Sequence, residues 1–240
     1  MSSLTAEDRI ERYRNLWRYA KVCFSVVLAK TFLSILWEYR LYFPADFESS
    51  FLSGRRYTFF GSYRWYFYIH ILSSPVALVL GTALYLSARN GKHWRLHRIL
   101  GRAQILIVLI LVMPTGLMLA QQAYAGPIAT WAFSLQAIAT GFCALATTWF
   151  ARNKQIDRHQ QWAERCFLLL CTPLMFRLVS GAAIVMGFDT ETLYQCNAWI
   201  SWLLPFAAFE VWNRRHSAAE IRKTTHSINF SNPTRLPNEC

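Results

Sequence analysis

Long runs of nearly uncharged, apolar residues recur along this chain, and they constrain its fold more than any other feature. A helix of about 20 apolar residues crosses the hydrocarbon core of a bilayer. Hydrophobic residues make up 54% of the chain and charged residues 16%, against about 25% charged residues in soluble proteins. We therefore predict an all-α, polytopic membrane protein with six transmembrane helices, of which spans two to five form a four-helix core bundle. The six expected spans are 19–37, 65–87, 103–124, 128–151, 166–187 and 197–212.

The distribution of Lys and Arg predicts which side of the membrane each loop occupies. Basic residues concentrate in four segments, which are 9–18, 89–102, 152–165 and 214–235. The loops at 125–127 and 188–196 contain neither Lys nor Arg. Because cytoplasmic loops carry the excess of basic residues, we predict that both termini and the basic turns are cytoplasmic. The exception is the loop at 38–64, which holds the four arginines Arg40, Arg55, Arg56 and Arg64.

The net charge of +12 raises the question of a nucleic-acid partner, and the placement of the cations argues against one. They flank apolar segments, and neither a zinc-finger spacing nor an aromatic-studded basic groove accompanies them. Cations beside membrane segments attract anionic lipid headgroups instead. We therefore expect the bilayer and its anionic lipids as partners, with a place in a membrane complex as a further option.

The spans divide the chain into six segments with different expected roles. The N-terminal segment carries three acids and is no cleavable signal peptide, so the first span should remain as an anchor. The segments are a cytoplasmic N-terminal segment with a short amphipathic helix (1–18), the first anchor (19–37), an aromatic outward loop lying on the interface (38–64), the four-helix core (65–187), an outer loop with the sixth helix (188–212), and a basic tail expected to be disordered (213–240).

Four of the expected spans each contain a proline. The positions are Pro75, Pro114, Pro173 and Pro205. Each proline removes a helical donor and frees a backbone carbonyl, which needs another partner inside a membrane. Kinked helices of this kind can enclose a cavity, although proline is also common in ordinary membrane helices.

Three short motifs resemble those of a known family. They read HILSSPVALVLG at 70–81, LHRILGR at 96–102 and DRHQQWAER at 157–165, followed by Arg177. In this order and spacing they resemble a bacterial family of membrane proteins, the domain of unknown function 2306, over about 65–187. The resemblance implies a helical membrane fold in a bacterial inner membrane and no particular activity. Ala163 stands where the family often has methionine.

Two histidines in basic turns are the main candidates for ligand binding. His97 and His159 each precede a span and are followed by an arginine, Arg102 and Arg165 respectively. Two facing imidazoles could ligate the iron of a single b-type haem, and guanidinium groups bind carboxylates such as haem propionates. Alternatively, the same residues bind lipid phosphates or satisfy the polar groups at helix ends.

The turn at 92–102 holds a second histidine, His93, four residues before His97. As a zinc site this pair lacks further ligands. We expect the turn to lead directly into the third span with Trp94 at the interface, His93 toward solvent or headgroups, and His97 toward the start of the fifth span. Gly101 shares the face of His97 and would allow close helix approach there.

His70 lies near the opposite end of the second span from the basic turns. It could donate to a quinone carbonyl, or pair with Gln121 or Gln122. The two-haem cytochromes of the b561 type need a histidine pair near each face of the membrane. Because the outer side of this chain has no second intramembrane histidine, at most one haem is expected.

Two cations, Arg177 and Lys30, lie well inside expected spans, whereas Lys21 is near the end of the first span. A cation at the bilayer centre costs about 2.5–3.5 kcal/mol, so each needs protein, water or a counter-charge. No acid lies within the core spans, and an ion pair for Arg177 is therefore not evident from the sequence. We expect Arg177 to face the interior of the bundle beside a polar pocket.

Several enzyme classes are not supported, because the chain has no G-x-S-x-G elbow, Walker loop or H-E-x-x-H motif. Two hypotheses remain. The first is a non-enzymatic accessory or scaffold subunit whose basic turns bind anionic lipid. The second is an electron-transfer protein that holds one b-type haem or a quinone, with His97, His159, Arg102, Arg165, His70 and Arg177 as the candidate site residues.

Overall fold

The computed structural model describes residues 6–48, 52–53, 55–90, 94–188 and 190–231. These residues are helical almost throughout, and no β-strand occurs among them. The long elements are α1 (Ala6–Glu38), α3 (Arg64–Asn90), α4 (Trp94–Leu106), α5 (Met113–Ala120), α6 (Gly126–Arg152), α7 (Ile156–Leu170), α8 (Thr172–Val185) and α9 (Glu191–Ser231). The predicted fold class, an all-α polytopic membrane protein, is confirmed.

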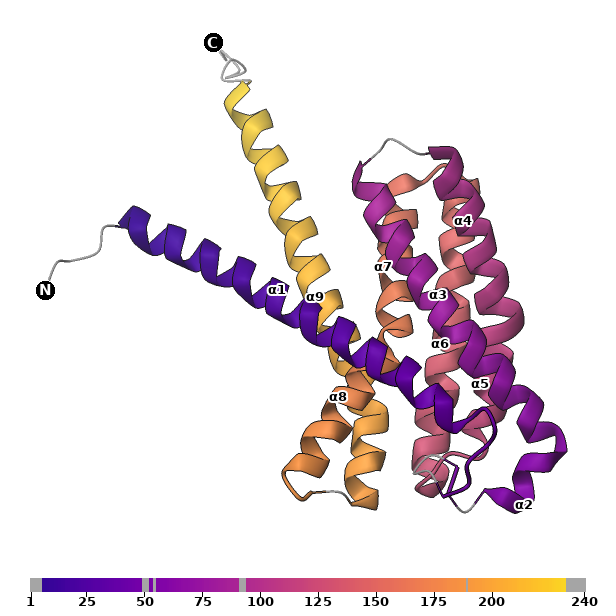
Figure 1. The fold of residues 1–240 in the computed structure, drawn as a ribbon. Helices are drawn as coiled ribbons and strands as arrows, with labels where there is room; N and C mark the ends of the chain where they lie inside the picture. Colours follow the sequence, from indigo (N-terminus) through magenta and orange to yellow (C-terminus); the bar gives the residue numbers. More distant parts are fainter. Residues whose placement is uncertain (1–5, 49–51, 54, 91–93, 189, 232–240) are drawn as a thin grey trace, which may run out of the picture.

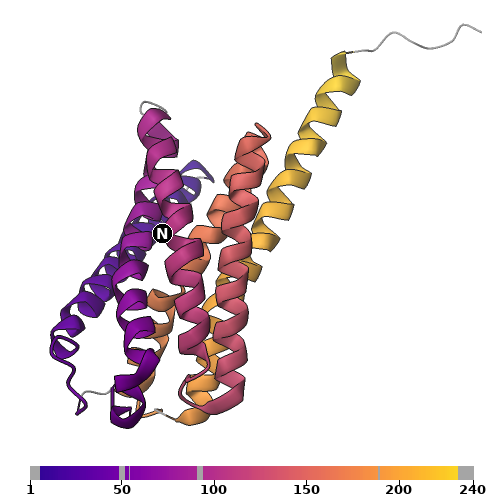
Figure 2. The ribbon, with the colours of Figure 1, turned by 90° about the vertical axis from the view of Figure 1, so that its right-hand side faces the viewer.

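Five helical segments of the described chain are long and apolar enough to cross a membrane, and they cover the first five predicted spans except for residues 121–124 and 186–187. Their limits are Glu11–Leu41, Arg56–Ala88, Trp94–Ala120, Gly126–Arg152 and Ile156–Val185. The sixth predicted span lies within α9, which contains Pro205 and is not one of these five segments. Successive spans run in alternating directions, with α4–α5 and α7–α8 each forming one span, and α9 extends well beyond the bundle (Figures 1 and 2).

The core bundle consists of α3, the α4–α5 pair, α6 and α7 (Figure 1). Small and medium side chains dominate its fully buried positions, including Ala77, Val108 and Ala144. Such residues let the helix backbones approach closely, which is how helices associate inside lipid. The fifth span bends at Cys171, so that α8 leaves the bundle and pairs with α9 instead.

Two prolines shape the α3 and α4–α5 helices. Pro75 lies inside α3, and the carbonyl of Ile71, four residues earlier, accepts a hydrogen bond from the Tyr39 hydroxyl. Pro114 follows a π-helical segment, η3 (Ile107–Val112), which joins α4 to α5. A π-bulge of this kind redirects a helix without exposing its backbone.

The bend between α7 and α8 is also stabilised by a side chain. Pro173 cannot donate to the carbonyl of Leu169, and the Gln136 side-chain amide on α6 donates to that carbonyl at 3.2 Å. The backbone polar group freed by the proline therefore has a partner inside the bundle. This satisfies the requirement that applies to any break in a membrane helix.

The aromatic loop at 38–64 folds as a cap on the N-terminal end of α3. We call it the outer cap, because this end is the one predicted to face outward. Its short helices are η1 (Tyr39–Leu41), α2 (Arg56–Thr58) and η2 (Phe59–Tyr63). The buried side chains of this cap form a second core with Phe67, and they are Tyr42, Leu52, Phe59 and Tyr63. The segment has its own packed interior and is more than a flap on the interface.

Two terminal segments differ from the sequence expectations. The 8–18 segment is continuous with the first span in α1, because no glycine or proline separates them. The expected disordered tail is instead helical as far as Ser231, and its run SAAEIRK consists mostly of good helix formers.

Candidate functional site

The end of the bundle that carries the basic turns, here called the basic end, brings together side chains of α3, α4, α6 and α7. His97 lies in the first turns of α4, and its Nδ1 is 2.9 Å from the Ser87 hydroxyl on α3. That hydroxyl also donates to the Leu84 carbonyl at 3.0 Å. Because a hydroxyl has one proton, we assign the Nδ1–H of His97 as the donor to Ser87.

His159 occupies the first turn of α7, directly after a tight turn. Lys154 adopts the left-handed conformation with φ of 57°, which is a common way to end a helix such as α6. The Nδ1 of His159 then lies 3.0 Å from the carbonyl oxygen of Thr147 on α6. Since a carbonyl only accepts, Nδ1 carries the proton.

The two histidines lie near the starts of their helices, His97 in α4 and His159 in α7. In both rings Nδ1 is engaged, which leaves the Nε2 lone pair available. The structure thus places the two histidines of the predicted site at the same end of the bundle, each with a partner on another helix. It places Gly101 differently, since a Cβ there would meet Leu84 of α3 at 3.9 Å and not the fifth span. His93 lies outside the described residues.

The basic end is surrounded by exposed cations without acidic partners. Six such residues flank the two histidines: Arg95, Arg98, Arg102, Arg152, Lys154 and Arg158. None of them takes part in a salt bridge within the described part of the chain. Arg98 lies over the Trp94 ring at 5.9 Å and Arg158 over the Phe150 ring at 5.7 Å. The predicted site residue Arg102 therefore remains accessible to an anion.

Arg165, the other arginine expected beside the histidines, is buried and paired. Its Nε and Nη2 donate to the two carboxylate oxygens of Glu210 on α9, at 2.5 and 3.1 Å. Its guanidinium also lies over the rings of Trp162 and Phe209, at 4.8 and 5.6 Å. This pair is not evident from the sequence, because an acid near the end of an apolar span also suits a helix that tilts toward the interface.

Arg177 on α8 pairs with Glu38 at the end of α1, with its Nη2 at 2.9 Å from Oε2 and its Nη1 at 3.2 Å from Oε1. This counter-charge is not evident from the sequence, since Glu38 is 139 positions away and outside the core spans. Arg177 therefore faces α1 and the outer cap.

His70 is remote from the other two histidines. It is 17 residues from Ser87 along α3, which corresponds to about 25 Å at 1.5 Å per residue. Its Nδ1 lies 3.1 Å from the Thr115 hydroxyl, so its partner is neither Gln121 nor Gln122. No cluster of three or more His, Cys, Asp or Glu that could hold a metal ion occurs among the described residues.

Together these features define a polytopic, all-α membrane protein with a four-helix core, a histidine pair at its basic end and two ion pairs between helices. A family model described as "Predicted membrane protein (DUF2306)" matches residues 67–212, more than half of the chain. The chain belongs to this family, as the motifs indicated, and the matched region extends beyond 65–187 into α9. No curated protein and no solved structure matches the chain.

Proposed function

We propose that the protein is a non-enzymatic accessory or scaffold subunit of a bacterial inner membrane, and that its basic end binds anionic lipid headgroups. The observation that carries this proposal is the group of six exposed cations at the basic end, none of which has a salt bridge within the described part of the chain. Each cation near an anionic surface contributes about 1 kcal/mol. By contrast, Arg165 and Arg177 each have a carboxylate of their own.

The same cations support a cytoplasmic orientation of the basic end and of both termini. The arginines of the outer cap are an exception to the charge rule, and each of them is engaged by an aromatic ring. The distances from guanidinium carbon to ring centre are 4.4 Å for Arg40 over Trp37, 5.7 Å for Arg55 over Tyr63, 5.9 Å for Arg56 over Phe47 and 5.0 Å for Arg64 over Trp65.

The test is the melting temperature of the full chain in nanodiscs of phosphatidylcholine, with and without phosphatidylglycerol. We expect the anionic lipid to raise Tm, and the triple variant Arg95→Gln, Arg98→Gln, Arg102→Gln to lose roughly half of this rise, because half of the cations are gone. The matched control is the outer pair Arg40→Gln, Arg56→Gln, which should keep the full rise. An unchanged rise in the triple variant would contradict lipid binding at the basic end.

A second candidate is an electron-transfer protein with one b-type haem or a quinone at His97 and His159. Ligating histidines usually donate their other ring N–H to a carbonyl or a similar acceptor, and both rings do so here, at 2.9 and 3.0 Å. This candidate predicts a reduced-minus-oxidised Soret band in protein purified from haem-replete cells. The band should disappear in His97→Ala and in His159→Ala and persist in His93→Ala. A colourless preparation would contradict the haem hypothesis.

A further inference from the structure

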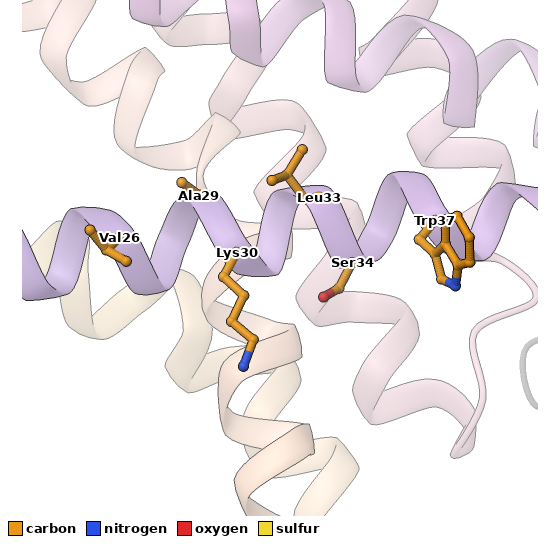
Figure 3. A pocket seen from close by; sticks show the side chains of 6 residues that line it. All are labelled: Val26, Ala29, Lys30, Leu33, Ser34 and Trp37. Carbon is orange, nitrogen blue, oxygen red and sulfur yellow. The ribbon is translucent and has the colours of Figure 1, made fainter.

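The membrane-spanning part of α1 has a face that no other element covers. Figure 3 shows this face, which we call the α1 face and which is lined only by residues of α1: Val26, Ala29, Lys30, Leu33, Ser34 and Trp37. Their spacing of three and four residues places them on one side of the helix. None of the most apolar part of α1 is buried, and Figure 1 shows this helix diverging from the core bundle.

Lys30 lies in the middle of this apolar face. The nearest acid toward the outer end of α1 is Glu38, eight residues away, which corresponds to about 12 Å along the helix. Glu38 is already paired with Arg177. No salt bridge of Lys30 occurs in the described part of the chain, although an ammonium group inside a bilayer is costly without a counter-charge.

The charge of Lys30 distinguishes among three possible occupants of the α1 face, which are lipid tails, a second copy of the chain and a transmembrane helix of another protein. Lipid tails would leave the ammonium without a counter-charge, and the same face of a second copy would bring two Lys30 side chains together. A transmembrane helix with a carboxylate supplies the missing charge. The small residues Ala29 and Ser34 beside Lys30 allow the close approach on which helix association in membranes depends.

We propose that the α1 face is the docking site for a transmembrane helix of another membrane protein, one that carries an Asp or Glu within its apolar segment. This inference rests on the proposed role as an accessory subunit, and it specifies the partner. Lys30 forms an ion pair with that carboxylate, and the α1 face packs against the partner helix on both sides of this pair.

The experiment uses energy transfer in vesicles of pure phosphatidylcholine, so that anionic-lipid binding plays no part in it. The full chain, with its native cysteines replaced, carries a donor dye at Tyr13→Cys. The acceptor is on a Leu/Ala transmembrane peptide with one central Asp, and a matched peptide has Leu at that position. We expect the Asp peptide to bind about tenfold more tightly than the Leu peptide, as polar contacts between membrane helices allow.

Variants of the full chain locate the effect. Lys30→Met should abolish the preference for Asp, while Lys30→Arg keeps it. Lys21→Met is the matched control, since Lys21 is a second cation of α1 and lies 5.8 Å from the Trp17 ring centre; the preference should survive there. Equal binding of the two peptides, or an undiminished preference in Lys30→Met, would overturn the proposal. If two labelled copies of the chain bind each other more tightly than the chain binds the Asp peptide, the proposal is overturned in favour of self-association.

Discussion

Arg165 on α7 and Glu210 on α9 form a two-bond ion pair that joins α9 to the core bundle. The Arg165 side chain is 11% exposed and that of Glu210 is 26% exposed. Removal of one partner of a buried pair leaves an uncompensated charge, which typically costs about 3 kcal/mol or more. The pair therefore attaches α9 to the bundle, and this attachment requires both residues.

Glu210→Leu should accordingly destabilise the protein by about 3 kcal/mol, measured as the free energy of unfolding in mixed micelles. The double variant Arg165→Leu, Glu210→Leu should recover a large part of this loss, because it buries no unpaired charge. The matched control is Glu164→Leu, one position before Arg165 and outside this pair. If the double variant is as unstable as the sum of the two single variants, the residues are not coupled.

Arg177 and Glu38 connect α8 to α1 in the same manner but nearer to the surface. Their side chains are 37% and 35% exposed, so solvent screening reduces the expected energy of the pair to about 1 kcal/mol. We predict that Arg177→Leu increases the rate of proteolysis at the end of α1 with little change in overall stability. Arg177→Lys should retain part of the protection. Equal protease sensitivity of wild type and Arg177→Leu would show that the pair does not hold α1.

The fold could be predicted from the sequence because hydropathy reports directly on burial in lipid. The first, second and fourth predicted spans fall within helical segments of sufficient length and apolarity, and the third and fifth extend beyond theirs by four and two residues. The limits of the helices were harder to predict from the sequence, since Trp94–Leu106 begins nine residues before the predicted third span. A polar first turn such as that of α4 is compatible with helix or loop, and only packing on α3 decides between them.

The candidate site was predictable in part. His97 and His159 lie in turns next to spans, so topology alone places them at the same end of the bundle. Their partners Ser87 and Thr147 could not be identified, because serine and threonine are frequent in membrane helices. The acids that pair with Arg165 and Arg177 lie 45 and 139 positions away, and composition contains no information on such distant pairings.

The hydrogen bond from Gln136 to the Leu169 carbonyl predicts a coupling between two positions on different helices. Gln136→Leu removes the donor and should cost about 1 kcal/mol. In a Pro173→Ala background the helical N–H of residue 173 can bond the same carbonyl, so the cost of Gln136→Leu should fall. A double-mutant cycle on the free energy of unfolding measures this difference. Equal costs in both backgrounds would contradict the role assigned to Gln136.

Gly81 on α3 and Gly181 on α8 offer a matched pair for the packing of the core. A Cβ at Gly81 would lie 3.1 Å from Cδ2 of Phe167, whereas a Cβ at Gly181 meets nothing within 4 Å. The ring of Phe167 is stacked on Tyr85, with centroids 5.7 Å apart and planes 7° apart, so it has little freedom to move away.

In an open helical position, Gly→Ala stabilises a helix by about 0.5–1 kcal/mol, and we expect this gain for Gly181→Ala. For Gly81→Ala the contact with the Phe167 ring should outweigh the gain, with a net loss of about 1 kcal/mol. Phe167→Leu should restore tolerance of Ala at position 81, because a smaller and more flexible side chain can yield. Unfolding titrations of the three variants and the double variant test this, and a stabilising Gly81→Ala would show that α3 and α7 are farther apart than the structure places them.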